Sequence, residues 1–443
     1  MLMEPNVSIV EEPPRAASRE PARDRALTQA QRLRSIVAGS AGNLVEWYDF
    51  YVYAFTALYF AASFFPTGDR TAQLLNVAGV YAAGFLIRPI GGWYFGRLAD
   101  RRGRRASMIV SVLLMGAGSL MIAVLPTYAS IGAAAPALLL VARLIQGFSL
   151  GGEYGAAATY LSEVATDARR GFYASFQYVT LIGGQLSALA VLLVVQGFLD
   201  DATIRAWGWR LMFGIGAVVA LAVMRLRGSM HETVNVATRS DAGSIVELAR
   251  HWRAFFVVLL VTAGGSLTLY TFTTYMQKFL VNTAGMDVKV VSFVMTAAIV
   301  FFMLLQPVIG ALSDRIGRRK CLLLFSGVMM VGAVPLLTAL STVRRPAEAL
   351  ALVALGMLIL TFYTSISGLF KAELFPQHVR ALGVALGHSV SAAVFGGSAE
   401  YIALWFKQAG HEPRFFWYVA LMCACAFVTA LFMREPRRVT MRT

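Results

Sequence analysis

Charged residues are scarce in this chain, and their scarcity argues against an ordinary soluble domain. Of its 443 residues, 14% are charged and 58% are hydrophobic, whereas about a quarter of the residues in a soluble domain are charged. Cysteine is rarer still, because Cys321, Cys423 and Cys425 are the whole set and lie in or beside apolar stretches. We therefore expect small core residues at these positions, and neither a metal nor a cofactor. No nucleophile–base set is apparent, so the sequence does not predict an enzyme.

Basic residues outnumber acidic ones and give a formal net charge of +15. Most of them lie in short loops between apolar stretches and not on a polar domain surface, so nucleic acid is not an expected partner. The loops on one side hold the larger share, which by the positive-inside rule predicts that both termini are cytoplasmic. Residues 1–34 are rich in Arg, Pro and Glu without an apolar core. They are predicted to be a disordered cytoplasmic tail and not a cleaved signal peptide.

Twelve apolar stretches follow, each about long enough to cross a bilayer as a helix. Their centres lie near residues 50, 85, 116, 148, 184, 216, 267, 300, 331, 361, 393 and 423. The longest polar interruption, residues 227–251, separates six stretches from six and is predicted to be a cytoplasmic loop. The chain is thus expected to be an all-α membrane protein. Its predicted parts are a bundle at 35–226, a second bundle at 252–433 and a cytoplasmic tail at 434–443.

Two motifs occur twice, offset by roughly 210 residues, which indicates a duplicated membrane unit. Gly96-x-x-x-Asp100-Arg101-x-Gly103-Arg104 returns as Gly310-x-x-x-Asp314-Arg315-x-Gly317-Arg318, and the Glu163/Arg170 pair returns as Glu373/Arg380. The fold predicted is therefore twelve helices in two pseudo-symmetric six-helix bundles. The aspartates should lie at helix ends, where a carboxylate can meet a partner helix end or an arginine. The predicted gating residues are Asp100, Arg101, Arg104, Glu163, Arg170, Asp314, Arg315, Arg318, Glu373 and Arg380.

Several charges lie inside the predicted membrane spans, where an ionisable residue is costly and usually lines a cavity or pairs with another. Glu46 and Asp49 are one helical turn apart on the first stretch, and Arg143 and Glu153 share a helix face with Gln146 on the fourth. A carboxyl group that can hold or lose a proton is what proton coupling needs. The alternative is that both carboxylates are ionised and held by arginines. The predicted proton-coupling residues are Asp49, Arg143, Glu46 and Glu153.

Arg88 precedes Asp100 by twelve positions, which places it about 18 Å along a helix and near the bilayer centre. It is either a substrate anchor or a partner of Glu153, since a guanidinium can donate two parallel bonds to a carboxylate. Lys371 lies two residues before Glu373, so it either faces the substrate or snorkels to the membrane surface. His388 is interpreted as a packing histidine. The predicted substrate-binding residues are Arg88, Tyr53, Gln177, Tyr270, Lys278, Lys371 and Tyr363.

The segment 145–170 resembles the sugar-transporter signature of the major facilitator superfamily, with Gly147, Gly151, Tyr160, Glu163 and Arg170 at its positions. The stretches GNLVEWYDFYVY, GGEYGAAATYLSEV and FYTSISGLFKAELFPQHVRALGV resemble, more narrowly, the metabolite:proton symporters that take up α-ketoglutarate (2-oxoglutarate). The resemblance implies proton-coupled uptake of this dicarboxylate across a bacterial inner membrane by a multi-pass monomer. Its partners would be the substrate, protons and the lipid bilayer. The alternatives are another organic acid, such as citrate, shikimate or an aromatic acid, or a zwitterionic osmolyte.

Proton-coupled sugar porters of the superfamily pair an aspartate of the first helix with an arginine of the fourth. Asp49 and Arg143 fall on the matching positions. This chain departs from the sugar porters by adding Glu46 and Glu153. Which carboxylate carries the proton therefore stays open.

Overall fold

The computed structural model describes residues 29–66, 70–166, 168–228 and 243–433, and their secondary structure is entirely helical. The predicted tail at 434–443, residues 1–28 of the predicted N-terminal tail, and residues 229–242 of the predicted loop lie outside these ranges. The first helix begins at Gln29, earlier than the bundle boundary expected at residue 35.

The first half consists of long helices that are connected by short helices and turns. They are α1 Gln29–Phe64, α2 Arg70–Leu86, α3 Arg88–Arg102, α4 Arg104–Val124, α5 Tyr128–Ile131, α6 Ala134–Val164, α7 Arg170–Phe198, α8 Asp201–Thr203 and α9 Trp209–Arg227, with a π-helical turn at Ile204–Gly208. A short helix, α10 Ile245–Arg250, connects the two halves.

The second half has the same plan with more interruptions. Its helices are α11 Trp252–Tyr270, α12 Met276–Asn282, α13 Val288–Ile316, α14 Arg318–Thr342, α15 Pro346–Thr364, α16 Ser367–Glu373, α17 Arg380–Ser391, α18 Ala399–Gln408 and α19 Pro413–Phe432. Short turns lie at Thr271–Tyr275, Gln377–Val379 and Ala392–Gly396.

Among the described residues, ten helical segments from Arg104 onward are long and apolar enough to cross a membrane. Four of them join two helices into one span, as α8–α9, α11–α12, α15–α16 and α17–α18 do. The helix α1 and the α2–α3 pair supply the first two spans. The prediction of a twelve-helix membrane protein in two bundles is confirmed.

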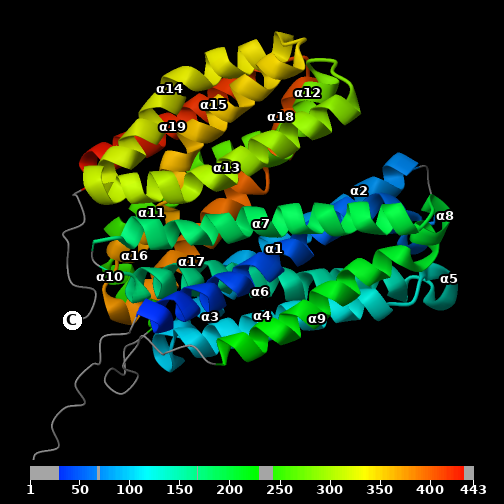
Figure 1. Cartoon of the computed structure of the whole chain (residues 1–443), viewed down its shortest axis with the longest axis horizontal. Coiled ribbons are helices and arrows are strands. Elements are labelled where there is room, and N and C mark those ends of the chain that lie inside the picture. Colours follow the sequence, from blue (N-terminus) through cyan, green and yellow to red (C-terminus); the bar gives the residue numbers. More distant parts are fainter. Residues whose placement is uncertain (1–28, 67–69, 167, 229–242, 434–443) are drawn as a thin grey trace, which may run out of the picture.

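Figure 1 shows the halves as two groups of helices, with α7 and α13 side by side between them. A second contact joins α3 of the first half to α17 of the second. The helix α10 lies at the end of the molecule where α16 and α17 lie (Figure 1). We call this the basic end, because the arginine-rich turns at 101–105 and 315–319 also lie there. The α7–α13 and α3–α17 contacts therefore run along helices that reach the basic end.

The two repeated turns owe their shape to glycine. Gly103, between α3 and α4, has φ 98°, and Gly317, between α13 and α14, has φ 96°. Only glycine adopts this region without strain. Each glycine lets one membrane helix end and the next begin at once, which fixes the preceding aspartate at a helix C-terminus. The duplicated sequence thus builds the same helix–turn–helix unit twice.

Breaks inside the membrane spans position the functional side chains. The second span is interrupted at Ile87, and Arg88 and Pro89 open α3, where proline can sit because its missing N–H is not needed. The tenth span is interrupted at Ser365 and Ile366, between α15 and α16. In transporters, discontinuous helices near the midplane commonly form the binding site.

Candidate functional site

Arg88 enters a cavity between the two halves from the first turn of α3. Its side chain is buried, with Cζ 3.8 Å from the ring centroid of Phe85 and 4.7 Å from that of Phe50. Its Nε and Nη2 have no hydrogen-bond partner among the described residues. A β-carbon on Gly151 would clash with the Arg88 carbonyl, so α6 packs directly behind this turn. The aromatic rings hold the guanidinium and leave donors free for a ligand.

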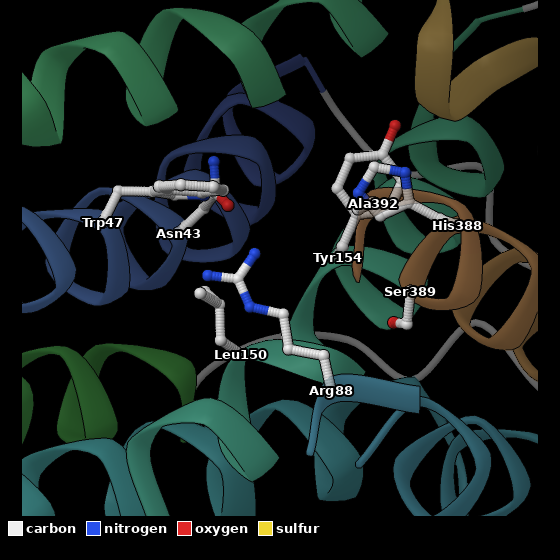
Figure 2. Close-up of a pocket in the computed structure, with 8 residues that line it drawn as sticks. All are labelled: Asn43, Trp47, Arg88, Leu150, Tyr154, His388, Ser389 and Ala392. Atoms are coloured by element: carbon white, nitrogen blue, oxygen red, sulfur yellow. The ribbon is translucent and has the colours of Figure 1, made fainter. Parts of the chain in front are cut away.

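The Arg88 cavity draws its walls from both halves. Figure 2 shows its lining: Asn43, Trp47, Arg88, Leu150, Tyr154, His388, Ser389 and Ala392.

Lys371 approaches this cavity from the second half, on α16. Its Nζ donates to Tyr154 Oη at 3.0 Å, Ser367 Oγ at 2.9 Å and Tyr363 Oη at 3.4 Å, and lies 3.1 Å from His388 Nδ1. The side chain has no exposed surface. The alternative that Lys371 snorkels to the membrane surface is therefore wrong. Its sequence distance from Glu373 suggested the surface, but the break before α16 turns the lysine inward.

His388 lines the cavity, and the interpretation of it as a packing residue missed this. Its ring stacks on that of Tyr154, with centroids 3.5 Å apart and an interplanar angle of 13°. One signal in the sequence could have found it. His388 is the single histidine inside a predicted membrane span, and an ionisable residue there is a functional candidate by default.

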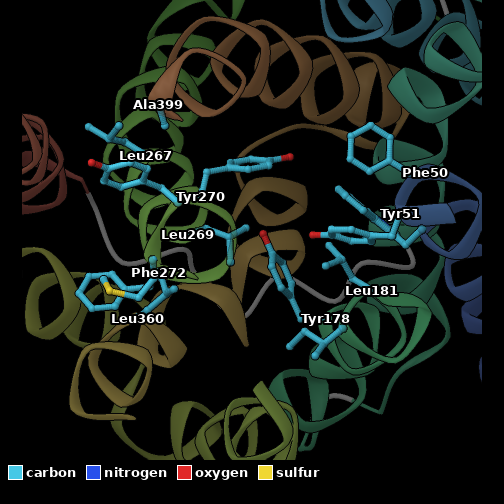
Figure 3. Close-up of a cluster of buried hydrophobic side chains, with 14 of the residues drawn as sticks. Phe50, Tyr51, Tyr178, Leu181, Leu267, Leu269, Tyr270, Phe272, Leu360 and Ala399 are labelled. Carbon is cyan, nitrogen blue, oxygen red and sulfur yellow. The ribbon is translucent and has the colours of Figure 1, made fainter. Parts of the chain in front are cut away.

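A second cavity shares one lining residue, Trp47, with the Arg88 cavity. Tyr270, a predicted substrate residue, lines it together with Tyr51 and Gln185. Figure 3 shows the hydroxyl groups of Tyr51, Tyr178 and Tyr270 turned toward the space between the halves.

The remaining predicted substrate residues lie around these cavities or away from them. Gln177 donates to the Tyr154 carbonyl at 3.2 Å and so supports the wall behind the Arg88 cavity. Tyr53 donates to the Val77 carbonyl at 3.2 Å, inside the first half. Lys278 is half-exposed and forms an ion pair with Glu400. Neither Tyr53 nor Lys278 lines either cavity.

A polar cluster inside the first half holds Asp49 and Arg143. Asp49 is fully buried, and neither of its carboxylate oxygens has a hydrogen-bond partner among the described residues. A β-carbon on Gly216 would clash with this carboxylate, so α9 closes over it. Arg143 donates to Gln146 Oε1 at 2.7 Å and lies 4.3 Å above the ring centroid of Tyr53. Neutral groups therefore hold Arg143, and no ion pair joins it to Asp49.

The other two predicted proton-coupling carboxylates are Glu46 and Glu153. Glu46 is buried and accepts a hydrogen bond from Ser111 Oγ at 3.1 Å. The backbone of Glu153 belongs to α6, and its side chain lies outside what the structure describes.

Two sets of charges link the halves at the basic end. In the first latch, formed by Asp100, Arg104, Glu163 and Arg380, Asp100 accepts from the backbone N–H groups of Ala381 at 3.1 Å and Leu382 at 2.9 Å. These groups open α17, so the carboxylate caps a helix of the other half. Arg104 pairs with Asp100 and, at 3.3 Å, with Glu163, which also accepts from Arg380 at 2.9 Å.

The second latch is the pseudo-symmetric copy, formed by Asp314, Arg318, Glu373 and Arg170. Asp314 accepts from the N–H groups of Gly171 at 2.8 Å and Phe172 at 3.1 Å, at the start of α7. Arg318 pairs with Asp314 at 3.0 Å, and Glu373 lies 3.8 Å from Arg318 and 3.9 Å from Arg170.

Of the ten predicted gating residues, eight thus lie in the latches. Arg101 and Arg315 are exposed, and it is Arg104 and Arg318 that pair with the two aspartates. Among the side chains that the structure describes, no group of three or more His, Cys, Asp or Glu could hold a metal ion.

Comparison with known proteins agrees with this architecture. The family model of the Major Facilitator Superfamily matches residues 39–399. The chain is 58% identical to the alpha-ketoglutarate permease of Escherichia coli over 407 residues, which cover 91% of this chain and 94% of the permease. It is 33% identical to the citrate-proton symporter of Salmonella typhi over 93% of this chain and 96% of the symporter. Among solved structures, the proton:xylose symporter XylE bound to 6-bromo-6-deoxy-D-glucose superposes with a TM-score of 0.78, at 16% identity, over 94% of this chain and 98% of XylE. The chain, a multi-pass membrane protein, belongs to the major facilitator superfamily.

Proposed function

We propose that this protein takes up 2-oxoglutarate together with protons across a bacterial inner membrane by alternating access. One observation carries the proposal. Arg88 lines the cavity from the first half, Lys371 of the second half contacts its wall residues Tyr154 and His388, and neither buried cation forms an ion pair with a described side chain. The 58% identity to the alpha-ketoglutarate permease of Escherichia coli supports the choice of substrate.

Two cations without described counter-charges suit a dianion. A buried charge is costly unless it is paired, so a dicarboxylate would stabilise the site that it enters. The Arg88 guanidinium supplies the planar fork that a carboxylate matches. Lys371 lies behind the cavity wall, where its charge polarises the wall residues Tyr154 and His388. A zwitterion would also need an anionic subsite, which Glu153 could supply.

Proton coupling is assigned to Asp49 and Arg143. Moving two negative charges into a negative interior costs about 4.6 kcal/mol at 100 mV, and accompanying protons offset that cost. An unpaired, fully buried Asp49 beside an Arg143 held by Gln146 is the arrangement expected when Asp49 carries a proton. Loss of the proton would draw Arg143 toward Asp49. Glu46 and Glu153 are the other candidate carriers, and substitution of each tests the assignment.

Alternating access follows from rocking of one bundle, 35–226, against the other, 252–433. With the basic end in the cytoplasm, as the positive-inside rule predicts, the closed latches shut the cavity from the inside. The tails 1–34 and 434–443 and the connection 227–251 are then cytoplasmic as well. The proposed transport unit is the monomer, since both cations come from one chain.

Uptake into proteoliposomes tests the proposal. An imposed inward proton gradient should drive labelled 2-oxoglutarate into the vesicles, and a protonophore should stop it. Citrate, shikimate and glycine betaine serve as competitors in the same assay, with 2-oxoglutarate expected to compete best. Uptake that follows a sodium gradient and ignores pH would contradict proton coupling. Stronger competition by glycine betaine would contradict the dicarboxylate site.

A further inference from the structure

The imidazole of His388 is held in one orientation by two contacts. Its ring stacks on Tyr154, with centroids 3.5 Å apart, and its Nδ1 lies 3.1 Å from the ammonium of Lys371. A ring flip would preserve the stack but would place a carbon where Nδ1 now meets the ammonium. The orientation of the ring in the cavity wall is therefore set.

The same contact fixes the tautomer of the ring. The proposed function takes Lys371 as an ammonium, which has hydrogens to donate and no lone pair to accept with, so Nδ1 is then the acceptor. In the neutral ring the proton is then on Nε2. No described side chain accepts from Nε2, and His388 lines the Arg88 cavity. Figure 2 shows one nitrogen of the ring turned toward the side of the cavity that holds Arg88 and Asn43.

Other polar side chains of this wall already use their donors inside the protein. Ser389 Oγ donates to the Gly151 carbonyl at 2.9 Å. Asn43 Nδ2 donates to the Gln177 carbonyl at 2.6 Å and to Thr180 Oγ1 at 2.9 Å, which accounts for both amide hydrogens. The Nε2–H of His388 and the free Nε and Nη2 of Arg88 therefore face the cavity as open donors from opposite halves.

We propose that His388 is the specificity-determining residue that recognises the 2-oxo group of the substrate, and that Lys371 acts as its positioning residue. This inference rests on the proposed function, because it assumes that a dicarboxylate occupies the cavity. With one carboxylate on Arg88, the ketone oxygen accepts from Nε2–H. A ketone oxygen is only an acceptor, so it matches a fixed donor. Glutarate has no acceptor there, and glutamate would present an ammonium to the N–H.

Competition binding with the full chain in proteoliposomes tests the inference. Labelled 2-oxoglutarate is displaced by unlabelled 2-oxoglutarate or by glutarate, which has the same carbon chain without the ketone. The wild-type protein should prefer 2-oxoglutarate by about tenfold, the value of one hydrogen bond to a neutral group. His388→Phe keeps an aromatic ring on Tyr154 and removes the donor. This variant should bind 2-oxoglutarate about tenfold more weakly than the wild type does, and its affinity for glutarate should be unchanged.

Two further variants complete the test. His388→Gln retains an N–H near the position of Nε2 and should keep part of the preference. If His388→Phe does not fold, His388→Gln takes its place in the competition assay. His411→Phe, at an exposed turn between α18 and α19, is the matched control and should bind as the wild type does.

Three outcomes would overturn the inference. Equal weakening of both ligands by His388→Phe would make His388 a packing residue, and a wild-type protein without preference would show that the ketone is not recognised. In both cases the proposed function survives, because a dicarboxylate still binds. If the wild-type protein binds neither 2-oxoglutarate nor glutarate, the proposed function fails as well.

Discussion

The charges of the first latch and those at the centre of the molecule are both buried, yet they are satisfied differently. Asp100 and Arg104 have no exposed side-chain surface and pair with each other, with Glu163 and with a helix N-terminus. Arg88 and Asp49 are also buried, and neither forms an ion pair with a described side chain. A paired charge holds two parts of the protein together, whereas an unpaired one is available to a ligand or a proton. Pairing therefore separates the residues of the gate from those of the transport sites.

The largest effect is expected at Asp49. Asp49→Asn mimics the protonated carboxyl group and leaves Arg143 on Gln146. Because no proton can then be released inside, accumulation of 2-oxoglutarate driven by a proton gradient should be abolished. Exchange of internal for external substrate should continue, since exchange requires no net proton movement. Both rates are measured in the same proteoliposomes.

Glu46→Gln is the comparison variant for this experiment, because Glu46 accepts a hydrogen bond that an amide oxygen can also accept. It should still accumulate substrate. If Asp49→Asn accumulates substrate and either Glu46→Gln or Glu153→Gln does not, the proton carrier is one of those glutamates.

Arg88→Ala should have the next largest effect, on binding. Truncation leaves a desolvated substrate carboxylate without its partner, a loss of about 2–5 kcal/mol, which corresponds to at least about thirtyfold weaker affinity. Arg88→Lys keeps the charge without the planar fork, so its affinity for 2-oxoglutarate should lie between those of the wild type and Arg88→Ala. Equilibrium binding of labelled 2-oxoglutarate measures all three. Normal affinity in Arg88→Ala would mean that Arg88 serves only as a partner of Glu153.

The two latches should differ from each other, although one duplicated motif builds both. Asp100→Asn should slow turnover by about tenfold or more, because it leaves a fully buried Arg104 with one carboxylate fewer. Asp314→Asn should slow it less, since Arg318 and Asp314 are slightly exposed and Glu373 lies 3.8 Å or more from its arginines. Exchange rates report turnover. A large loss of substrate affinity with normal turnover in Asp100→Asn would contradict a gating role.

The sequence anticipated the latches better than the cavity, for a physical reason. A duplicated motif specifies both copies at once, so the repeat pointed to Asp100, Asp314 and their partners from spacing alone. The position of Lys371 depends on a helix break at Ser365 and Ile366, and neither of these two residues is a proline or a glycine. Lys278 pairs with Glu400, 122 positions away. Such long-range pairing is decided by tertiary packing, which local spacing does not encode.

The contact of α10 with the first latch was likewise beyond the sequence. Gly243 donates its N–H to the His378 carbonyl at 2.9 Å, and Glu247 lies 3.5 Å from His378 Nε2 and 2.7 Å from Arg250. His378 precedes Arg380 by two positions, so α10 braces the first latch; no comparable contact of α10 with the second latch is described. The brace is a further difference between the two copies.

Removing this brace should have the smallest effect. Partial desolvation raises the pKa of Glu247, but His378 and Arg250 outweigh it, and the pKa lies below its ordinary value. A lowered carboxyl pKa means that the contribution of Glu247 is complete above its unfolded-state pKa and is lost as pH falls through the folded-state value. At neutral pH, Glu247→Gln should therefore mimic the acid form and change the exchange rate by less than about twofold, as expected for exposed pairs.

Glu348→Gln, which breaks an exposed pair with Arg345 away from both latches, should leave the rate unchanged. A loss in Glu247→Gln as large as that in Asp314→Asn would make α10 part of the gate itself.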